Sequence, residues 1–148
     1  TGANNNPYTG ADITLTNYED VFGQPQSLSS AGLGNANITN GKLDFTLGTP
    51  TGGWVDLTSS GTTVNPGNTK ILIILGFTDG SNHVYNRYYS GGSSSAVYIY
   101  ADKNVTLSGN GIDGQVRLAK GWNYAILKTG NELSSGEPDA SYKWLLIQ

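Results

Sequence analysis

Apolar and polar residues alternate with a period of two in several short segments of this chain, and the longest apolar run lies at residues 70–77. Turn-forming residues flank the run, with Asn65-Pro66-Gly67-Asn68 before it and Asp79-Gly80 after it. The run is too short to cross a bilayer as a helix. Its length and flanking turns predict a strand that is buried on both faces.

Three turn motifs predict hairpins. Residues 35–39 and 42–47 flank Asn40-Gly41, the pair that a type I′ turn prefers because both central residues need positive φ. Asp79-Gly80 predicts a second hairpin, between the apolar run and residues 83–89. Lys120-Gly121 predicts a third, between residues 115–119 and 122–128. Shorter alternating segments predict further strands at residues 11–17, 54–58, 96–101, 104–108 and 142–147.

No segment carries the sustained 3.6-residue period of an amphipathic helix. Residues 27–32 fit either one helical turn, capped by serine and stopped by Gly32, or an irregular loop. We therefore predict an all-β fold, a single antiparallel β-sandwich of about nine to eleven strands. The sandwich would occupy residues 11–148, after a flexible Asn-rich tether at residues 1–10.

Composition supports this fold class. Only 13% of the 148 residues are charged and 21 are glycine, which favours strands joined by tight turns over helices. The net charge is −3 and lysine and arginine form no cluster, so we expect no nucleic-acid partner. The absence of cysteine excludes disulfides, thiolate metal sites and cysteine nucleophiles.

The N-terminus suggests processing, because the chain begins with Thr1 and contains no methionine. We expect an exported protein whose signal peptide has been removed, secreted, periplasmic or tethered to the outer surface, with a lipid anchor as an option in the precursor. We expect no transmembrane segment. A fragment of a cytosolic protein would look the same, and this alternative stays open.

Catalytic chemistry has few candidate residues. His83 is the only histidine, and no G-x-S-x-G nucleophile elbow is present. Glycosidase chemistry needs two carboxylates that face one sugar ring, whereas Glu19 and Asp20 are the only adjacent pair. We therefore expect no enzyme and no catalytic residue, and we keep an unrecognised small hydrolase-like enzyme as an alternative.

Calcium is the one cofactor for which oxygen ligands are close in sequence. Asp102 with Asn104, and Asn110 with Asp113, carry the side-chain types that calcium prefers. Neither segment fits the twelve-residue EF-hand loop, and ordinary Asx turns explain both better. We expect no cofactor, with calcium as the alternative.

The aromatic residues are the most suggestive feature for binding. Strand alternation places Tyr85, Arg87 and Tyr89 on one face of residues 83–89, and Tyr98 with Tyr100 on one face of residues 96–101. If these strands pair, their rings form a surface for sugar or peptide. The alternative is that cross-strand tyrosine pairs stiffen an exposed sheet, at about 0.2–1 kcal/mol each.

Trp54 follows Gly52-Gly53, and we expect it to be the most exposed of the three tryptophans. It joins the candidate ligand-binding residues. Core or rim packing is the expectation for Trp122 and Trp144.

Two segments resemble known exported proteins. Ala36-Asn37-Ile38-Thr39-Asn40-Gly41-Lys42-Leu43-Asp44-Phe45-Thr46-Leu47 and Ala119-Lys120-Gly121-Trp122-Asn123-Tyr124 are similar to turns of small secreted or lipid-anchored β-sandwich proteins of unknown function from Gram-negative bacteria of spirochaete and Bacteroides type. The resemblance implies export, and no functional residue carries over from it. We predict a non-catalytic surface or periplasmic domain for binding or adhesion to a protein or carbohydrate partner. The alternative is a carbohydrate-binding module that uses the Tyr/Trp face.

Overall fold

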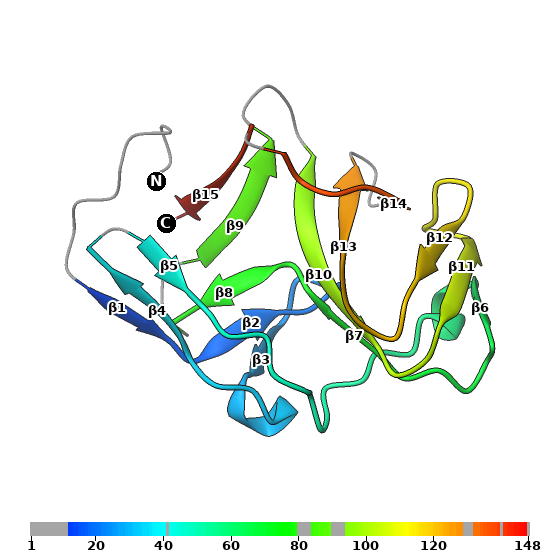
Figure 1. Cartoon of the computed structure of the whole chain (residues 1–148), viewed down its shortest axis with the longest axis horizontal. Helices are drawn as coiled ribbons and strands as arrows, with labels where there is room; N and C mark the ends of the chain where they lie inside the picture. Colours follow the sequence, from blue (N-terminus) through cyan, green and yellow to red (C-terminus); the bar gives the residue numbers. More distant parts are fainter. Residues whose placement is uncertain are drawn as a thin grey trace.

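The computed structural model describes residues 12–40, 42–79, 84–89, 94–128, 132–139 and 141–147, with the backbone alone for residues 84–89 and 143–147. These residues form an all-β, sandwich-like fold of fifteen strands and two short 3₁₀ helices (Figure 1). The predicted fold class is therefore confirmed, although the strands are shorter and more numerous than expected. No helix in the described part of the chain is long and apolar enough to span a membrane. The predicted tether lies outside the described residues.

The largest sheet runs through the middle of the molecule. Its main path is β14 (Glu132–Ser134), β13 (Gly121–Lys128), β10 (Ser95–Ala101), β9 (Val84–Tyr89), β8 (Gly76–Thr78), β2 (Asn17–Glu19) and β3 (Pro25–Ser27). In addition, β7 (Ile71–Ile74) pairs with β10, and β15 (Tyr142–Ile147) pairs with β9. All of these strand pairs are antiparallel.

Two three-stranded sheets flank the large one. One contains β1 (Ile13–Leu15), β4 (Ala36–Thr39) and β5 (Lys42–Asp44), and the other contains β6 (Thr62–Asn65), β11 (Val105–Gly109) and β12 (Val116–Leu118). Figure 1 shows them on opposite sides of β7, β10 and β13. The short helices η1 (Ser29–Ala31) and η2 (Thr58–Ser60) lie in the connections.

The apolar run forms β7 and β8, and β7 is buried on both faces as predicted. Ile71 and Ile73 pack into a core that contains no aromatic residue among the described ones, here called the aliphatic core. Leu72 and Ile74 pack on the other side, into a core that contains Phe77 and here called the aromatic core. A strand between two cores has no face for polar residues, which explains its unbroken apolar sequence.

Several predicted turns are confirmed. β4 pairs with β5 around Asn40, whose φ of 51° is the positive value that the type I′ turn requires. β8 pairs with β9, which confirms the second hairpin. At residues 27–32 the chain does form one helical turn, η1, and Gly32 stops it with a φ of 74°. The N-cap residue is Leu28, and the Ser27 Oγ just before it accepts a hydrogen bond from the Ser30 backbone N–H at 3.3 Å.

Two predictions were wrong. Residues 54–58 form no strand, because Asp56 accepts hydrogen bonds from the backbone and side chain of Thr58 and starts η2 instead. Lys120-Gly121 does not close a hairpin, since β12 pairs with β11 whereas β13 pairs with β10. Asn104 and Asn123 bind the backbone at residues 119–121, which satisfies polar groups that a hairpin would otherwise pair.

Candidate functional site

The two tyrosine-bearing strands pair, which is the condition that an aromatic surface on this sheet requires. β9 pairs with β10 through Arg87 opposite Ala96 and Tyr88 opposite Ser95. The side chains of Tyr85, Arg87 and Tyr89 lie outside the described residues. On β10, the side chains of Val97 and Ile99 enter the aliphatic core, whereas Tyr98 and Tyr100 pack against the aromatic core. The predicted alternation along β10 is therefore confirmed.

Pairing of β10 with β13 places two further aromatic rings on the face of the sheet that carries Tyr98 and Tyr100. Tyr124 stands opposite Tyr98 and Trp122 stands opposite Tyr100 across the β10–β13 pair. The ring centroids are 5.3 Å apart for Tyr98 and Tyr124 and 5.5 Å apart for Tyr100 and Trp122. Trp54 extends the set, with its centroid 6.1 Å from that of Tyr100. We call Trp54, Tyr98, Tyr100, Trp122 and Tyr124 the aromatic row.

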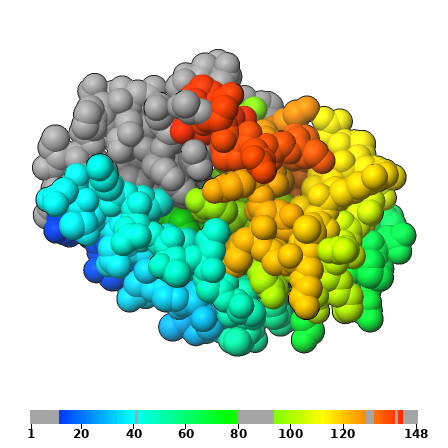
Figure 2. All heavy atoms as spheres, in the orientation of Figure 1, coloured from blue at the N-terminus to red at the C-terminus, as the bar shows by residue number. Residues whose placement is uncertain are grey.

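The aromatic row lies at the rim of its core. Tyr124 is 40% exposed, and the other four side chains are half-buried. The Trp122 indole Nε1 donates a hydrogen bond to the Gly48 carbonyl at 2.7 Å, which fixes the ring against the β5–η2 connection. Figure 2 shows this border on the surface, where the cyan segment around residues 40–50 meets the orange of β13. Half-buried Trp and Tyr rings offer apolar area with a polar edge.

A small cavity of about 280 Å³ opens at the Trp54 end of the row. Tyr18 in β2, Asp20 just after β2 and Gln26 in β3 line one part of it. Trp54 and Asp56 line it from the segment before η2. We call it the acidic pocket. It combines an aromatic wall with carboxylate and amide groups, the mixture that fixes the orientation of a polar ligand.

Asp20 is positioned by its own turn. Its carboxylate accepts hydrogen bonds from the backbone N–H groups of Phe22 and Gln24, both at 2.9 Å, and from the Gln26 side-chain amide at 3.0 Å. These three donors hold the carboxylate and orient Gln26 beside it. Pocket geometry at this end is therefore built by a local Asx turn.

Asp56 is the second acidic residue that lines the pocket. Its Oδ1 accepts hydrogen bonds from the Thr58 hydroxyl and from the Thr58 backbone N–H. These bonds, the side-chain one first, lower the pKa of Asp56 below its usual range. Asp56 is therefore an anion at neutral pH, and the backbone N–H of Ser59 further lowers its pKa.

Tyr18 reaches the pocket from the aromatic core and is only 2% exposed. Its hydroxyl lies so near Gly53 that a Cβ at that position would be 2.5 Å from it. No hydrogen bond to this hydroxyl occurs within the described part of the chain. Burial, and secondarily the charge of Asp20, raise the pKa of Tyr18, so the hydroxyl stays protonated and is a donor.

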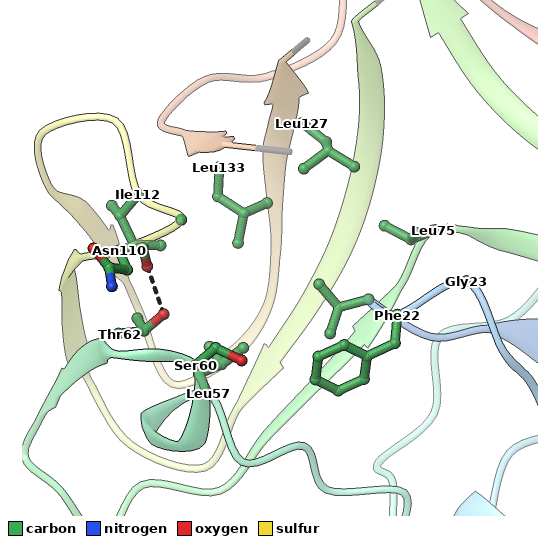
Figure 3. Close-up of a pocket in the computed structure, with 12 residues that line it drawn as sticks. Phe22, Gly23, Leu57, Ser60, Thr62, Leu75, Asn110, Ile112, Leu127 and Leu133 are labelled. Atoms are coloured by element: carbon green, nitrogen blue, oxygen red, sulfur yellow. Dashed lines mark hydrogen bonds between the residues drawn. The ribbon is translucent and has the colours of Figure 1, made fainter. Parts of the chain in front are cut away.

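A larger, apolar cavity of about 510 Å³ lies on the other side of Phe22, which lines both cavities. Figure 3 shows leucines 57, 75, 127 and 133 pointing into it from four different segments, with Thr62 and Asn110 at one edge. The Thr62 hydroxyl donates to the Asn110 carbonyl at 2.7 Å. Phe22 itself is 58% exposed. This cavity belongs to the aliphatic core and offers few polar groups to orient a ligand.

The four residues that were the alternative calcium ligands each make contacts within the chain. Asp102 accepts from the Lys70 backbone at 2.7 Å, Asn104 accepts from the Lys120 backbone at 2.8 Å, and Asp113 pairs with Lys128 at 2.6 Å. The side chain of Asn110 lies against Gly61. These contacts explain the residues as turn and surface groups.

Other candidate chemistry is sparse. Within the described ranges, no three His, Cys, Asp or Glu side chains converge as metal ligands would. Of the adjacent acids Glu19 and Asp20, Asp20 lines the acidic pocket and Glu19 does not. His83 and the side chain of Trp144 lie outside the described residues.

Sequence reasoning missed Tyr18, Gln26 and Asp56 as pocket residues, and Trp122 with Tyr124 as members of the row. The i, i+2 spacing of Trp122 and Tyr124 in a predicted strand was a signal that they share a face. The pocket had no such signal, because its two walls come from segments about thirty residues apart in the chain.

Comparison of the chain with protein-family models, with curated proteins and with solved structures finds no match. The resemblance of its two turn segments to exported bacterial proteins therefore stays a prediction. The aromatic row and the two pockets are therefore the features of this chain that bear on its function.

Proposed function

We propose that this chain is a non-catalytic domain that binds carbohydrate in an extracytoplasmic setting, through the aromatic row and the acidic pocket. The observation that carries the proposal is Trp54. Its ring continues the aromatic row and also lines a cavity with Asp20, Gln26 and Asp56. A pyranose has an apolar C–H face and a rim of hydroxyls, and this arrangement offers a partner for each.

The shape of the row favours an extended glycan. Cross-strand pairing on β10 and β13 holds four of its rings on one sheet face, so little conformational entropy is lost when a ligand lies across them. Trp54 connects this surface to the acidic pocket, because its ring contacts Tyr100 and also lines the pocket. The surface suits binding along a chain, and the pocket suits the recognition of one sugar unit.

The electrostatics favour binding over catalysis. A glycosidase needs one carboxyl group whose pKa is raised so that it donates a proton to the leaving oxygen. Thr58 lowers the pKa of Asp56 instead. Asp20 accepts three hydrogen bonds from Phe22, Gln24 and Gln26, which hold its carboxylate in a fixed position beside the cavity.

Titration of the protein with a broad panel of oligosaccharides tests the proposal, with intrinsic tryptophan fluorescence and calorimetry as readouts. We expect saturable binding of at least one glycan and a loss of affinity of at least tenfold, about 1.4 kcal/mol, in Trp54→Ala. Leu127→Ala is the matched control, because Leu127 is half-buried on the aliphatic side. No binding across the panel, or equal affinity in wild type and Trp54→Ala, would refute the proposal.

A further inference from the structure

The acidic pocket carries a charge that a neutral sugar does not explain. Half-buried Asp20 and exposed Asp56 both line it, and no lysine, arginine or histidine is among its described lining residues. Both carboxylates line one cavity of about 280 Å³, so a cation that enters it is attracted to two negative groups.

The Tyr18 hydroxyl is the second, independent observation. It is a polar group, 2% exposed, that lines the pocket and has no hydrogen-bond partner within the described residues. Buried polar groups are almost always hydrogen-bonded, so an exception in a cavity wall calls for a ligand group. Because the hydroxyl stays protonated, the group that it needs is an acceptor.

The aromatic walls suit a cation too. Tyr18, Phe22 and Trp54 all line the pocket, and ring faces attract ammonium groups. Trp54 already interacts in this way with Lys70, whose Nζ lies 5.7 Å from the ring centroid. Lys70 does not line the pocket, so it leaves the space between the carboxylates open.

We propose that the acidic pocket binds an amino sugar, a sugar unit that carries a protonated amine next to a hydroxyl. The ammonium group, which only donates, binds the carboxylates of Asp20 and Asp56. The neighbouring hydroxyl oxygen accepts the hydrogen bond from Tyr18. This inference rests on the proposed carbohydrate function and specifies the charge of the sugar.

The test compares glucosamine oligosaccharides with N-acetylglucosamine and glucose oligosaccharides of the same length. Calorimetry is performed at a pH above the carboxylate pKa values and below that of the amine. We expect the wild type to bind the glucosamine oligomer about tenfold more tightly than either neutral oligomer, since each solvent-accessible ion pair contributes up to about fivefold. Added salt should reduce this preference.

Two variants of pocket residues and one control variant assign the preference to the pocket. Asp56→Asn keeps the oxygen that binds Thr58 and should reduce the preference for the glucosamine oligomer about three- to fivefold. Asp44→Asn makes the same change of net charge on exposed β5 and should leave the preference intact. Tyr18→Phe should weaken binding of the glucosamine oligomer, because it removes the donor to the neighbouring hydroxyl.

The outcomes separate the two proposals. Equal affinity for charged and neutral oligomers would overturn the amino-sugar inference and leave the carbohydrate function standing. Binding of none of the oligomers would overturn both. A preference that Asp44→Asn reduces as much as Asp56→Asn would show long-range attraction and overturn the pocket assignment. Tighter binding of an oligolysine of equal charge would overturn the sugar assignment in favour of a basic peptide.

Discussion

Ile99 and Tyr98 are neighbours in β10, yet they enter cores of different chemistry. Ile99 packs into the aliphatic core and is fully buried, whereas Tyr98 contacts Tyr124 at the rim of the aromatic core. The aliphatic side excludes polar groups and so contributes mainly stability. The aromatic side keeps rings half in water, and Trp54 among them lies beside carboxylates. In the proposed function, the alternation of side chains along one sheet thus separates the residues for stability from those for binding.

The comparison of the two cores is tested first by a substitution in the aliphatic core, which should give the largest loss of stability. Ile99→Ala should lower the free energy of unfolding by about 2–5 kcal/mol, since it leaves a cavity in a fully buried site. Urea denaturation measures the loss. Glycan affinity of the folded variant should equal that of wild type, and a binding defect as large as that of Trp54→Ala would show that the two sides are not separate.

The close approach at Gly53 should give the next largest effect. Gly53→Ala places a Cβ 2.5 Å from the Tyr18 hydroxyl, at a φ of 79°. Gly114→Ala is the matched control, with a φ of 69° and no atom within 4 Å of the added Cβ. Strain at positive φ costs both variants roughly 1 kcal/mol. Gly53→Ala should lower the free energy of unfolding by roughly 1–3 kcal/mol more than this control does, because it displaces Tyr18. It should also weaken glycan binding. Equal midpoints in thermal melts of the two variants would contradict the close approach.

Tyr18→Phe should change the free energy of unfolding less, and should keep or raise it where most substitutions in a core lower it. The substitution keeps the buried ring and removes a hydroxyl without a partner, so the free energy of unfolding should stay equal or rise by up to about 1 kcal/mol. Tyr100→Phe, at a half-buried ring, should be near neutral. Chemical denaturation of both variants provides the measurement. A loss of more than about 1 kcal/mol in Tyr18→Phe would show that the hydroxyl is satisfied within the fold.

The smallest expected effect concerns acid stability. The pKa of Asp56 is lowered in the folded protein from its ordinary value of 3.8, so its bonds with Thr58 contribute stability above about pH 4. That contribution is lost as the pH falls through the lowered pKa. Asp56→Asn should therefore flatten slightly the acid side of a plot of melting temperature against pH. An identical acid slope in variant and wild type would count against this linkage.

Local signals sufficed where one segment carried the whole reason for its structure. The apolar run around Ile73 predicts a strand buried on both faces, because no polar residue interrupts it. Asn40 predicts a turn, because few residues other than glycine and asparagine adopt positive φ. The pairing of residues 84–89 with β10 followed from adjacency along the chain. The hairpin predicted at Lys120-Gly121 was wrong, because turn-forming residues alone do not determine whether the strands on either side pair with each other.

The sequence by itself determined the all-β class, the doubly buried strand and the side of β10 on which Tyr98 and Tyr100 lie. Alternation and turn propensity are properties of a few consecutive residues, so they can be read without knowledge of the fold. Only the tertiary structure decided that Trp122 and Tyr124 join these rings and that Tyr18, Asp20 and Asp56 surround one cavity. Contacts of this kind depend on strand register and on loops that are distant in sequence, and no local pattern encodes either.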